Sequence, residues 1–431
     1  MVTGYIKTLS VLVIALFTIS IHAELQIVVD GGVETPTRIA VVPFGWDGDT
    51  ALKEDVSAII ANDLRRSGMF KLMDEENMLS SPETESQVFF RDWRVSGNDF
   101  MLIGSMKPTA NGVKATVELF DILTEKKIWS QTIDSAGSDL RDIAHYIADE
   151  VFQKITGIRG AFATKVVYVT VQGLGDARKY RLQMADSDGA RPQTILASKE
   201  PILSPTWSRD GQKLAYVSFE TNRPAIYIQH LSTGKRQKVQ SFKGINGAPA
   251  WDPTGNKLAL VLSKDGNPEI YVLNLQNGGL QRITRHYGID TEPTWSPDGK
   301  SILFTSDRAG RPQIYRVNAT GGDIKRLTFK GNYNSRGRLT QDGRFLTMVH
   351  QDTDGYHIAV QDLKSGRLDI LTNSKDDESP TISPNGVMIM YATKLRGSGV
   401  LAGVSLDGKI KFTMPNSLGE VREPAWSPFL N

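Results

Sequence analysis

The sequence predicts a six-bladed β-propeller preceded by a small α/β domain. The first observation is a repeat, because Trp207, Trp251 and Trp295 lie 44 residues apart. A fixed period of about this length is typical of one supersecondary unit used again and again. The second observation is a turn-forming phrase after each tryptophan, and the third is a segment of helical and strand character before residue 160. Together they indicate an array of similar sheets attached to a second kind of domain.

Each repeat carries the signals of a four-stranded antiparallel sheet. In its turn phrase Pro fixes φ, Asp bonds to its own backbone and Gly adopts a positive φ. Runs of β-branched and aromatic residues follow each turn, as expected of strands. Such sheets are expected to pack radially as blades. The copies are Pro205-Thr-Trp-Ser-Arg-Asp-Gly211, Pro249-Ala-Trp-Asp-Pro-Thr-Gly255 and Pro293-Thr-Trp-Ser-Pro-Asp-Gly299, with weaker copies at 339–343 and 382–386.

The number of blades follows from an incomplete copy at the C-terminus. The phrase at 424–428 supplies only the first strand of a unit, and segments at 165–170, 180–184 and 194–196 match the missing partners. Five complete units and one shared between the two ends predict six blades over residues 159–431. Pairing of the two ends removes an open sheet edge that would otherwise favour aggregation.

Residues 34–158 predict the α/β domain. Strands are expected at 38–44, 99–104, 113–120 and 127–130. A helix is expected over 51–67, ended by Gly68. A second helix is expected after Ser138 as N-cap, with Leu140, Ile143, Ile147, Val151 and Ile155 on one face.

Residues 1–23 have the features of a cleavable secretory signal, with the single charge Lys7, an apolar run and the small residue Ala23. The run is too short for a membrane span. The chain contains no cysteine, which excludes lipid attachment after the signal and disulfides. We therefore expect a soluble, monomeric protein of an oxidising extracytoplasmic space that is stabilised by its apolar core and has no membrane span in the mature chain.

The formal charge of +2 at neutral pH argues against nucleic acid as a partner. An enzyme is the competing class, but no Gly-x-Ser-x-Gly motif occurs. The Asp-Gly pairs at Asp210, Asp298 and Asp342 lack the further ligands of a calcium loop and predict turns. No catalytic residue, metal or cofactor is therefore expected. A metal-binding pattern is absent from the histidines, which are His145, His230, His286, His350 and His357.

The segment at 24–33 is short, apolar and β-prone, and it allows two interpretations. It is either an edge strand of the α/β domain or a peptide that docks and undocks. Its residues are Glu24, Leu25, Gln26, Ile27, Val28, Val29, Asp30, Gly31, Gly32 and Val33.

Four features carry a family resemblance: the signal followed by 26–33, the phrase at 39–44, the helix-to-linker phrase at 148–162 and the Trp-Ser-Pro-Asp-Gly repeats. Together they resemble the TolB family, the periplasmic propeller proteins of the Tol-Pal system of Gram-negative bacteria. The similarity runs from residue 1 to residue 431 in the same order.

The resemblance implies a protein-interaction role. Proteins of this family bind Pal, the peptidoglycan-associated outer-membrane lipoprotein, at the mouth of the propeller canal, and residues 24–33 match the peptide that binds the C-terminal domain of TolA. The system supports outer-membrane invagination during cell division and outer-membrane integrity. Colicins and other outer-membrane or peptidoglycan-associated proteins are further expected partners. The alternative is an extracytoplasmic propeller that binds a cell-wall glycan or peptide without Tol-Pal partners.

A coupling hypothesis joins the two sites. The peptide at 24–33 alternates between a strand docked at the junction of the domains and a free form captured by TolA, and Pal and the docked form favour each other.

The canal mouth is expected just before the innermost strand of each repeat, which begins near the Pro-x-Trp phrase. Ile245 stands where the resemblance leads us to expect a histidine, so a pH-sensitive contact is not expected there. The alternative interpretation of any single residue at the predicted canal mouth is that it belongs to a solvated surface loop and binds no partner. The predicted Pal-binding residues are Ser204, Thr206, Asn246, Ala248, Thr291, Glu292, Asn334, Arg336, Glu378, Ser379, Arg422 and Glu423.

Overall fold

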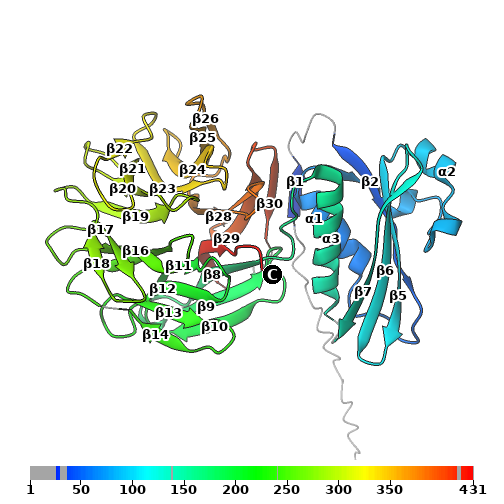
Figure 1. Ribbon diagram of the computed structural model, residues 1–431, viewed down its shortest axis with the longest axis horizontal. Helices are drawn as coiled ribbons and strands as arrows, with labels where there is room; N and C mark the ends of the chain where they lie inside the picture. The colour runs from blue at the N-terminus through cyan, green and yellow to red at the C-terminus, as the bar shows by residue number, and fades with distance from the viewer. Residues whose placement is uncertain (1–25, 30–35, 137–138, 240, 415–418, 431) are drawn as a thin grey trace, which may run out of the picture.

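The computed structural model describes residues 26–29, 36–136, 139–239, 241–414 and 419–430. Within these residues six antiparallel sheets form a propeller, and an α/β domain stands beside it (Figure 1). The predicted fold class is confirmed. No helix in the described ranges has the length and apolar character needed to cross a membrane. The expected signal at 1–23 lies outside the described residues.

The propeller strands follow the predicted period. The first blade contains β11 (Ile202–Trp207), β12 (Lys213–Ser218), β13 (Ala225–His230) and β14 (Arg236–Lys238); the second contains β15 (Asn246–Trp251), β16 (Lys257–Leu262), β17 (Glu269–Asn274) and β18 (Leu280–Arg282); the third contains β19 (Asp290–Trp295), β20 (Ser301–Ser306), β21 (Gln313–Asn318) and β22 (Lys325–Arg326); the fourth contains β23 (Tyr333–Leu339), β24 (Phe345–Gln351), β25 (Tyr356–Asp362) and β26 (Leu368–Ile370); the fifth contains β27 (Glu378–Ile382), β28 (Met388–Leu395), β29 (Ser398–Ser405) and β30 (Ile410–Thr413); and the sixth contains β31 (Glu420–Trp426), β8 (Lys165–Gln172), β9 (Lys179–Asp186) and β10 (Gln193–Ser198).

The sixth blade joins the two ends of the propeller, as the sequence predicts. β31 runs antiparallel to β8, with Val421 opposite Thr170 and Trp426 opposite Val166. Beyond the strand, the Ser427 amide donates to the Lys165 carbonyl at 2.8 Å. Backbone pairing between residues about 260 positions apart therefore closes the propeller.

Two of the repeated tryptophans bind their blade to the one before it. Trp207, Trp295 and Trp426 are all buried. The Trp207 indole donates to the carbonyl of Ala425 at 2.9 Å, and the Trp295 indole donates to that of Ala250 at 3.1 Å. A buried tryptophan supplies a large apolar surface and needs a partner for its N–H. The repeat phrase thus encodes contacts between blades as well as a turn.

The turn after each tryptophan has the predicted chemistry. In the first blade, Ser208 Oγ donates to Asp210 at 2.5 Å and accepts from the Lys213 amide at 2.9 Å. Gly211 adopts a φ of 69°, a conformation that glycine adopts without steric cost. The Asp-Gly pairs therefore form hairpins, as predicted.

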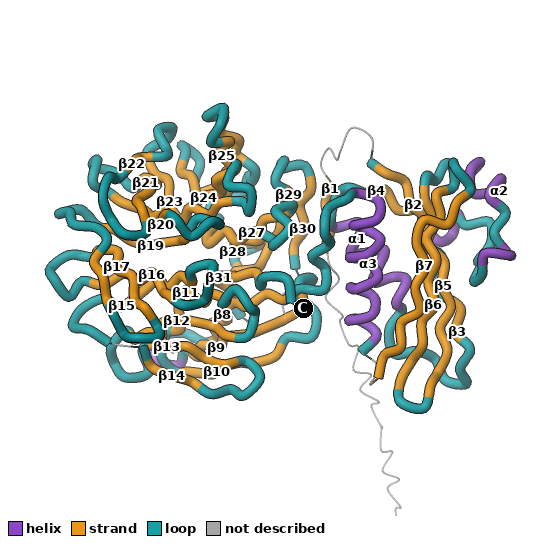
Figure 2. The backbone as a smooth tube through the Cα atoms, in the orientation of Figure 1, coloured by secondary structure: helices purple, strands orange, loops and turns teal. Residues whose placement is uncertain are grey.

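The α/β domain consists of one sheet with two helices on the side that faces the propeller. The sheet order is β4-β2-β5-β6-β7, and β3 also pairs with β5. Figure 2 shows the two long helices between this sheet and the blades. The elements are β2 (Thr37–Val41), β3 (Gly45–Trp46), α1 (Val56–Arg66), β4 (Phe70–Leu72), η1 (Glu75–Asn77), η2 (Glu85–Gln87), α2 (Phe90–Val95), β5 (Phe100–Thr109), β6 (Gly112–Asp121), β7 (Lys126–Ala136) and α3 (Leu140–Thr156), and a short η3 (Gly175–Ala177) follows β8.

Helix boundaries differ from the expectation because aspartates act as N-caps. α1 begins at Val56 and not at Ala51, since the Asp55 carboxylate accepts the Ala58 amide at 3.0 Å. α3 is capped by Asp139, which accepts from Arg141. The predicted cap Ser138 is therefore wrong, and that residue lies outside the described ranges. An aspartate that accepts an unpaired amide stabilises a helix start by about 1 kcal/mol. The short strands β3 and β4 and helix α2 were not predicted from the sequence.

The N-terminal strand belongs to the propeller and not to the α/β sheet. β1 (Gln26–Val29) pairs antiparallel with β30, the outermost strand of the fifth blade, with Ile27 opposite Phe412. The interpretation as an edge strand of the α/β domain is therefore wrong. In Figure 1, β1 lies beside β30 and next to α1. The remaining peptide residues, Glu24, Leu25, Asp30, Gly31, Gly32 and Val33, lie outside the described residues.

A buried polar cluster joins the two domains. Arg66, on α1, donates to the Ser187 carbonyl at 3.1 Å and to the Ser187 hydroxyl at 2.8 Å. His145, on α3, is 2% exposed and lies 2.5 Å from the Asp63 carboxylate. Burial opposes the charge of this imidazole, but Asp63 and Asp186 outweigh that effect and raise the pKa of His145 to about 10. A protonated histidine at neutral pH therefore sits between carboxylates of both domains.

Candidate functional site

Six non-glycine residues with a left-handed backbone surround the axis of the propeller, one in each blade. Their φ values lie between 43° and 56°. Each sits at a bulge in the innermost strand, where the pairing register shifts. The six residues, which we call the bulge ring, are Ser204, Ala248, Glu292, Arg336, Ser379 and Glu423.

The repeat phrase explains the bulge. In five of the six blades the residue after the bulge is a proline, and in the fourth it is Gly337. Proline disfavours the right-handed helical conformation in the residue before it and cannot donate to a ladder. A non-glycine residue in the left-handed region costs about 1–2 kcal/mol. Strain of this kind persists where the surrounding structure enforces it, and it gathers at binding sites.

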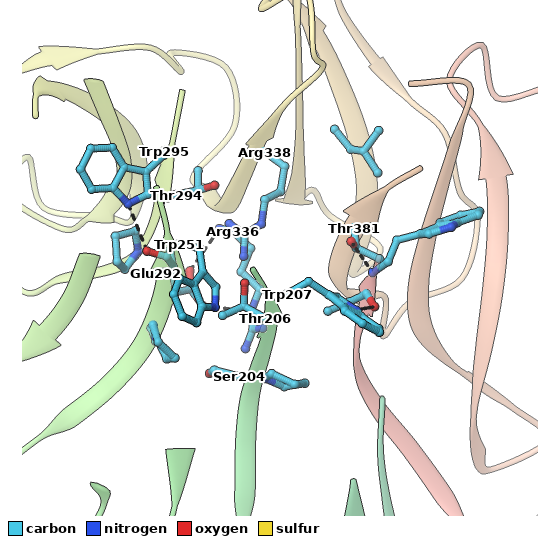
Figure 3. A pocket seen from close by; sticks show the side chains of 18 of the residues that line it. Ser204, Thr206, Trp207, Trp251, Glu292, Thr294, Trp295, Arg336, Arg338 and Thr381 are labelled. Carbon is cyan, nitrogen blue, oxygen red and sulfur yellow. Dashed lines mark hydrogen bonds and ion pairs between the residues drawn. The ribbon is translucent and has the colours of Figure 1, made fainter. Parts of the chain in front are cut away.

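The bulge ring lines a central canal of about 560 Å³. All six members contact it, together with the predicted residues Thr206 and Thr291. Figure 3 shows Ser204, Thr206, Glu292 and Arg336 inside the opening, with Thr381 across from Thr294. Glu378 and Arg422 line a second cavity of about 410 Å³, which shares Glu292 and Arg336 with the canal.

Two predicted residues do not lie at the canal surface. Asn246 is 1% exposed, and its side chain bonds to both backbone groups of Phe242 and to the Gly244 carbonyl. Asn334 is equally buried and bonds to the side chains of Gln313 and His350. Asparagine readily bonds to nearby backbone groups. Both residues therefore hold loops in place.

Charged side chains of the bulge ring bond to one another across three blades. Arg336 Nε lies 2.9 Å from Glu292 Oε1, and its Nη1 donates to Ser379 Oγ at 2.8 Å. Glu423 lies 3.6 Å from Arg336 and accepts the Ser204 amide. Burial opposes the charge of Arg336, but the Glu292 and Glu423 carboxylates outweigh it and raise its pKa. The mouth of the canal is therefore held in shape by a bonded set of charges.

The canal rim also carries exposed apolar side chains that the sequence analysis did not select. Leu203 and Ile245 line the canal and are 39% and 46% exposed. Ile289, directly before β19, is 49% exposed. They lie one to three residues before the bulge, so the repeat itself could have located them.

The cluster at the domain junction could be mistaken for a metal site. Asp63, His145 and Asp188 bring three ligand atoms within 4.8 Å of one another. However, Arg66 pairs with Asp63 at 3.0 Å and Arg141 pairs with Asp188. Carboxylates neutralised by arginines are poor ligands for a cation, so this cluster serves as an ion-pair network between the domains.

Strain in the bulge ring predicts opposite effects of two similar substitutions. Ala248→Gly should leave stability unchanged or raise it by up to about 1 kcal/mol, because glycine adopts a positive φ freely. The matched control, Ala250→Gly, two residues along the same strand, should lower stability by about 0.5–1 kcal/mol. Urea unfolding measures both. Equal losses in the two variants would contradict a strained backbone at Ala248.

Comparisons with known proteins agree with this architecture. Residues 25–128 match the family described as the TolB amino-terminal domain, and residues 152–430 match the TolB beta propeller domain. The chain is 55% identical to the Tol-Pal system protein TolB of Pseudomonas aeruginosa, over 97% of this chain and 99% of the relative. It is 54% identical to that of Pseudomonas syringae pv. syringae, over 95% of each chain.

A solved structure is similar over nearly the whole chain. The crystal structure of TolB from Acinetobacter baumannii superposes with a TM-score of 0.86 at 41% identity, covering 94% of this chain and 100% of that one. Sequence and architecture thus lead to one conclusion: the chain belongs to the TolB family and is a component of the Tol-Pal system.

Proposed function

We propose that this protein is a non-enzymatic periplasmic binding protein with two protein partners. It binds Pal at the canal mouth and the C-terminal domain of TolA through residues 24–33, after removal of the signal at 1–23. Through these contacts it supports outer-membrane invagination during division and outer-membrane integrity, and colicins exploit the canal. The bulge ring is the observation that carries this proposal, since it converts a repeat into a rigid, polar opening.

The chemistry of the rim fits a polypeptide better than a glycan. Exposed Leu203, Ile245 and Ile289 lie on the first three blades, while Glu378 and Arg422 lie beside the opening on the fifth and sixth. Protein interfaces combine an apolar patch with polar and charged residues around it. An inserted protein loop can contact both the apolar side and the charged side of the rim, with the preformed bulge ring between them.

The N-terminal peptide fits a strand that can be released. Residues 26–29 add a fifth strand to the outer edge of the fifth blade through backbone pairing with β30. Strand addition of this kind is a common mode of peptide recognition. We infer that TolA captures the peptide when it leaves this edge.

The fifth blade links the two sites. Its outermost strand, β30, pairs with β1, and its innermost strand, β27, carries Ser379 of the bulge ring. A shift of this blade would change both sites. We propose that Pal favours the docked peptide, and linkage then requires that each partner weaken binding of the other by the same factor.

Pal binding tests the canal. The mature chain should bind the soluble domain of Pal and not a cell-wall muropeptide, as measured by calorimetry. Glu292→Lys should weaken Pal binding at least about tenfold, because it breaks the ion pair with Arg336 and reverses a charge in the opening. The control, Asp323→Lys, makes the same charge change on the exposed outer part of the same blade. Muropeptide binding without Pal binding, or equal losses in the two variants, would argue for another function.

The peptide is tested by deletion of residues 24–33. TolA binding should disappear, while Pal binding should persist, since residues 26–29 pair at the outer edge of the fifth blade and not at the canal. In the full mature chain, saturating Pal should weaken TolA binding by about 5- to 150-fold, the usual range for coupled sites. Loss of both partners on deletion would mean that the segment is structural. Unchanged TolA affinity in the presence of Pal would rule out the coupling.

A further inference from the structure

A second ring of side chains lies in the canal, two residues after the bulge ring in each blade. Five of its members are small, and the sixth is an arginine. All six line the canal. The members are Thr206, Ala250, Thr294, Arg338, Thr381 and Ala425.

Arg338 has few bonds of its own. Its Nη1 donates to the Gly337 carbonyl at 3.0 Å, and across the described ranges no carboxylate forms an ion pair with its guanidinium. Arg336, two residues earlier on the same strand, has the neighbouring Glu292 and Glu423 as partners. Figure 3 draws both arginines between Thr294 and Thr381. The acids of the canal mouth are thus committed to Arg336, which leaves the deeper cation unpaired.

The position of Arg338 makes its charge costly. Burial, reinforced by the neighbouring Arg336, lowers the pKa of Arg338 to about 10 although Glu292 acts in the opposite direction. A guanidinium remains charged at neutral pH even so, and an unpaired charge in a partly desolvated site gains more from a partner than a charge in water does. An anion placed beside it would relieve this cost.

We propose that Arg338 is an anion-binding subsite inside the canal and that it binds a carboxylate carried by the inserted polypeptide partner. Arginine presents a planar fork of donors that matches a carboxylate with two parallel hydrogen bonds. The small neighbours at the same level leave space for an acidic side chain or a chain terminus in a canal of about 560 Å³. The subsite rests on the proposed function, because it presumes that a polypeptide enters the canal.

The mouth and the subsite have separate roles. The bonded set around Arg336 is complete without a partner and shapes the opening, whereas Arg338 gains its ion pair only when a partner enters. Specificity for an acidic residue in the inserted segment follows, since a site that holds an unpaired and partly desolvated cation rejects a segment that brings no anion.

The test compares Pal binding by the mature chain with Arg338→Gln and Arg338→Lys. Arg338→Gln should weaken binding at least about tenfold, because it leaves a buried carboxylate of the partner unpaired. Arg338→Lys should recover part of this loss, as a lysine keeps the charge without the fork. The control is Arg209→Gln, which removes an exposed arginine from the other part of the canal lining. Melting temperatures check that each variant folds.

A titration with sodium acetate separates a partner carboxylate from a small anion. The nuclear magnetic resonance signal of the Arg338 Nε–H should shift on addition of Pal, and acetate should compete with Pal for the unsubstituted chain but not for Arg338→Gln. Equal Pal affinity of the variants Arg338→Gln and Arg209→Gln would overturn the subsite for a partner carboxylate. If acetate nevertheless shifts the Arg338 Nε–H signal, Arg338 binds small anions only. Failure of the unsubstituted chain to bind Pal would instead overturn the proposed function and the ligand assigned to this subsite.

Discussion

The antiparallel pairing of β31 with β8 is the constraint on which the rest of the structure depends. The blades are marginal sheets by themselves, because each buries its faces only against its neighbours. The strand that ends at Trp426 completes the sixth blade with strands from the start of the propeller, and the Trp426 indole donates to Thr164 at the point where the α/β domain meets the propeller. Closure therefore fixes the diameter of the canal and the place of the second domain together.

The canal is an outcome of closure combined with a strained backbone. Each innermost strand carries one left-handed residue at the same level, so that six segments converge on one opening. Their conformations are held by the ladder bonds on either side and, in the first and third blades, by the tryptophan contacts as well. Blade-to-blade variation at these positions then sets the chemistry: small residues at Ser204 and Ala248, and charges at Glu292, Arg336 and Glu423. A repetitive scaffold thus presents a site without symmetry, as recognition of a single polypeptide requires.

The repeat made the propeller, its blade number and its closure predictable, because period, turn residues and strand patterns all agreed. The bulge ring was also within reach, since each member directly precedes Pro205 or its equivalent. Other features required coordinates. Asn246 and Asn334 share the polar character of loop residues, and sequence alone did not show that their side chains bond inward. The helix starts were displaced by Asp55 and Asp139, whose capping depends on local geometry. The partner of residues 26–29 lies almost 400 positions away, so local pattern could not identify β30.

Amide hydrogen exchange, in the free protein and in its complex with Pal, tests the central claim most directly. If closure maintains the canal, the amides that pair β31 with β8 exchange only when the whole propeller unfolds, as do those of β16 and β17, and Pal slows exchange around the bulge ring on all sides of the opening. Rapid exchange of β31 while the other blades stay protected, or protection by Pal confined to the outer edges of the blades, would contradict a closed propeller that receives its partner at the centre.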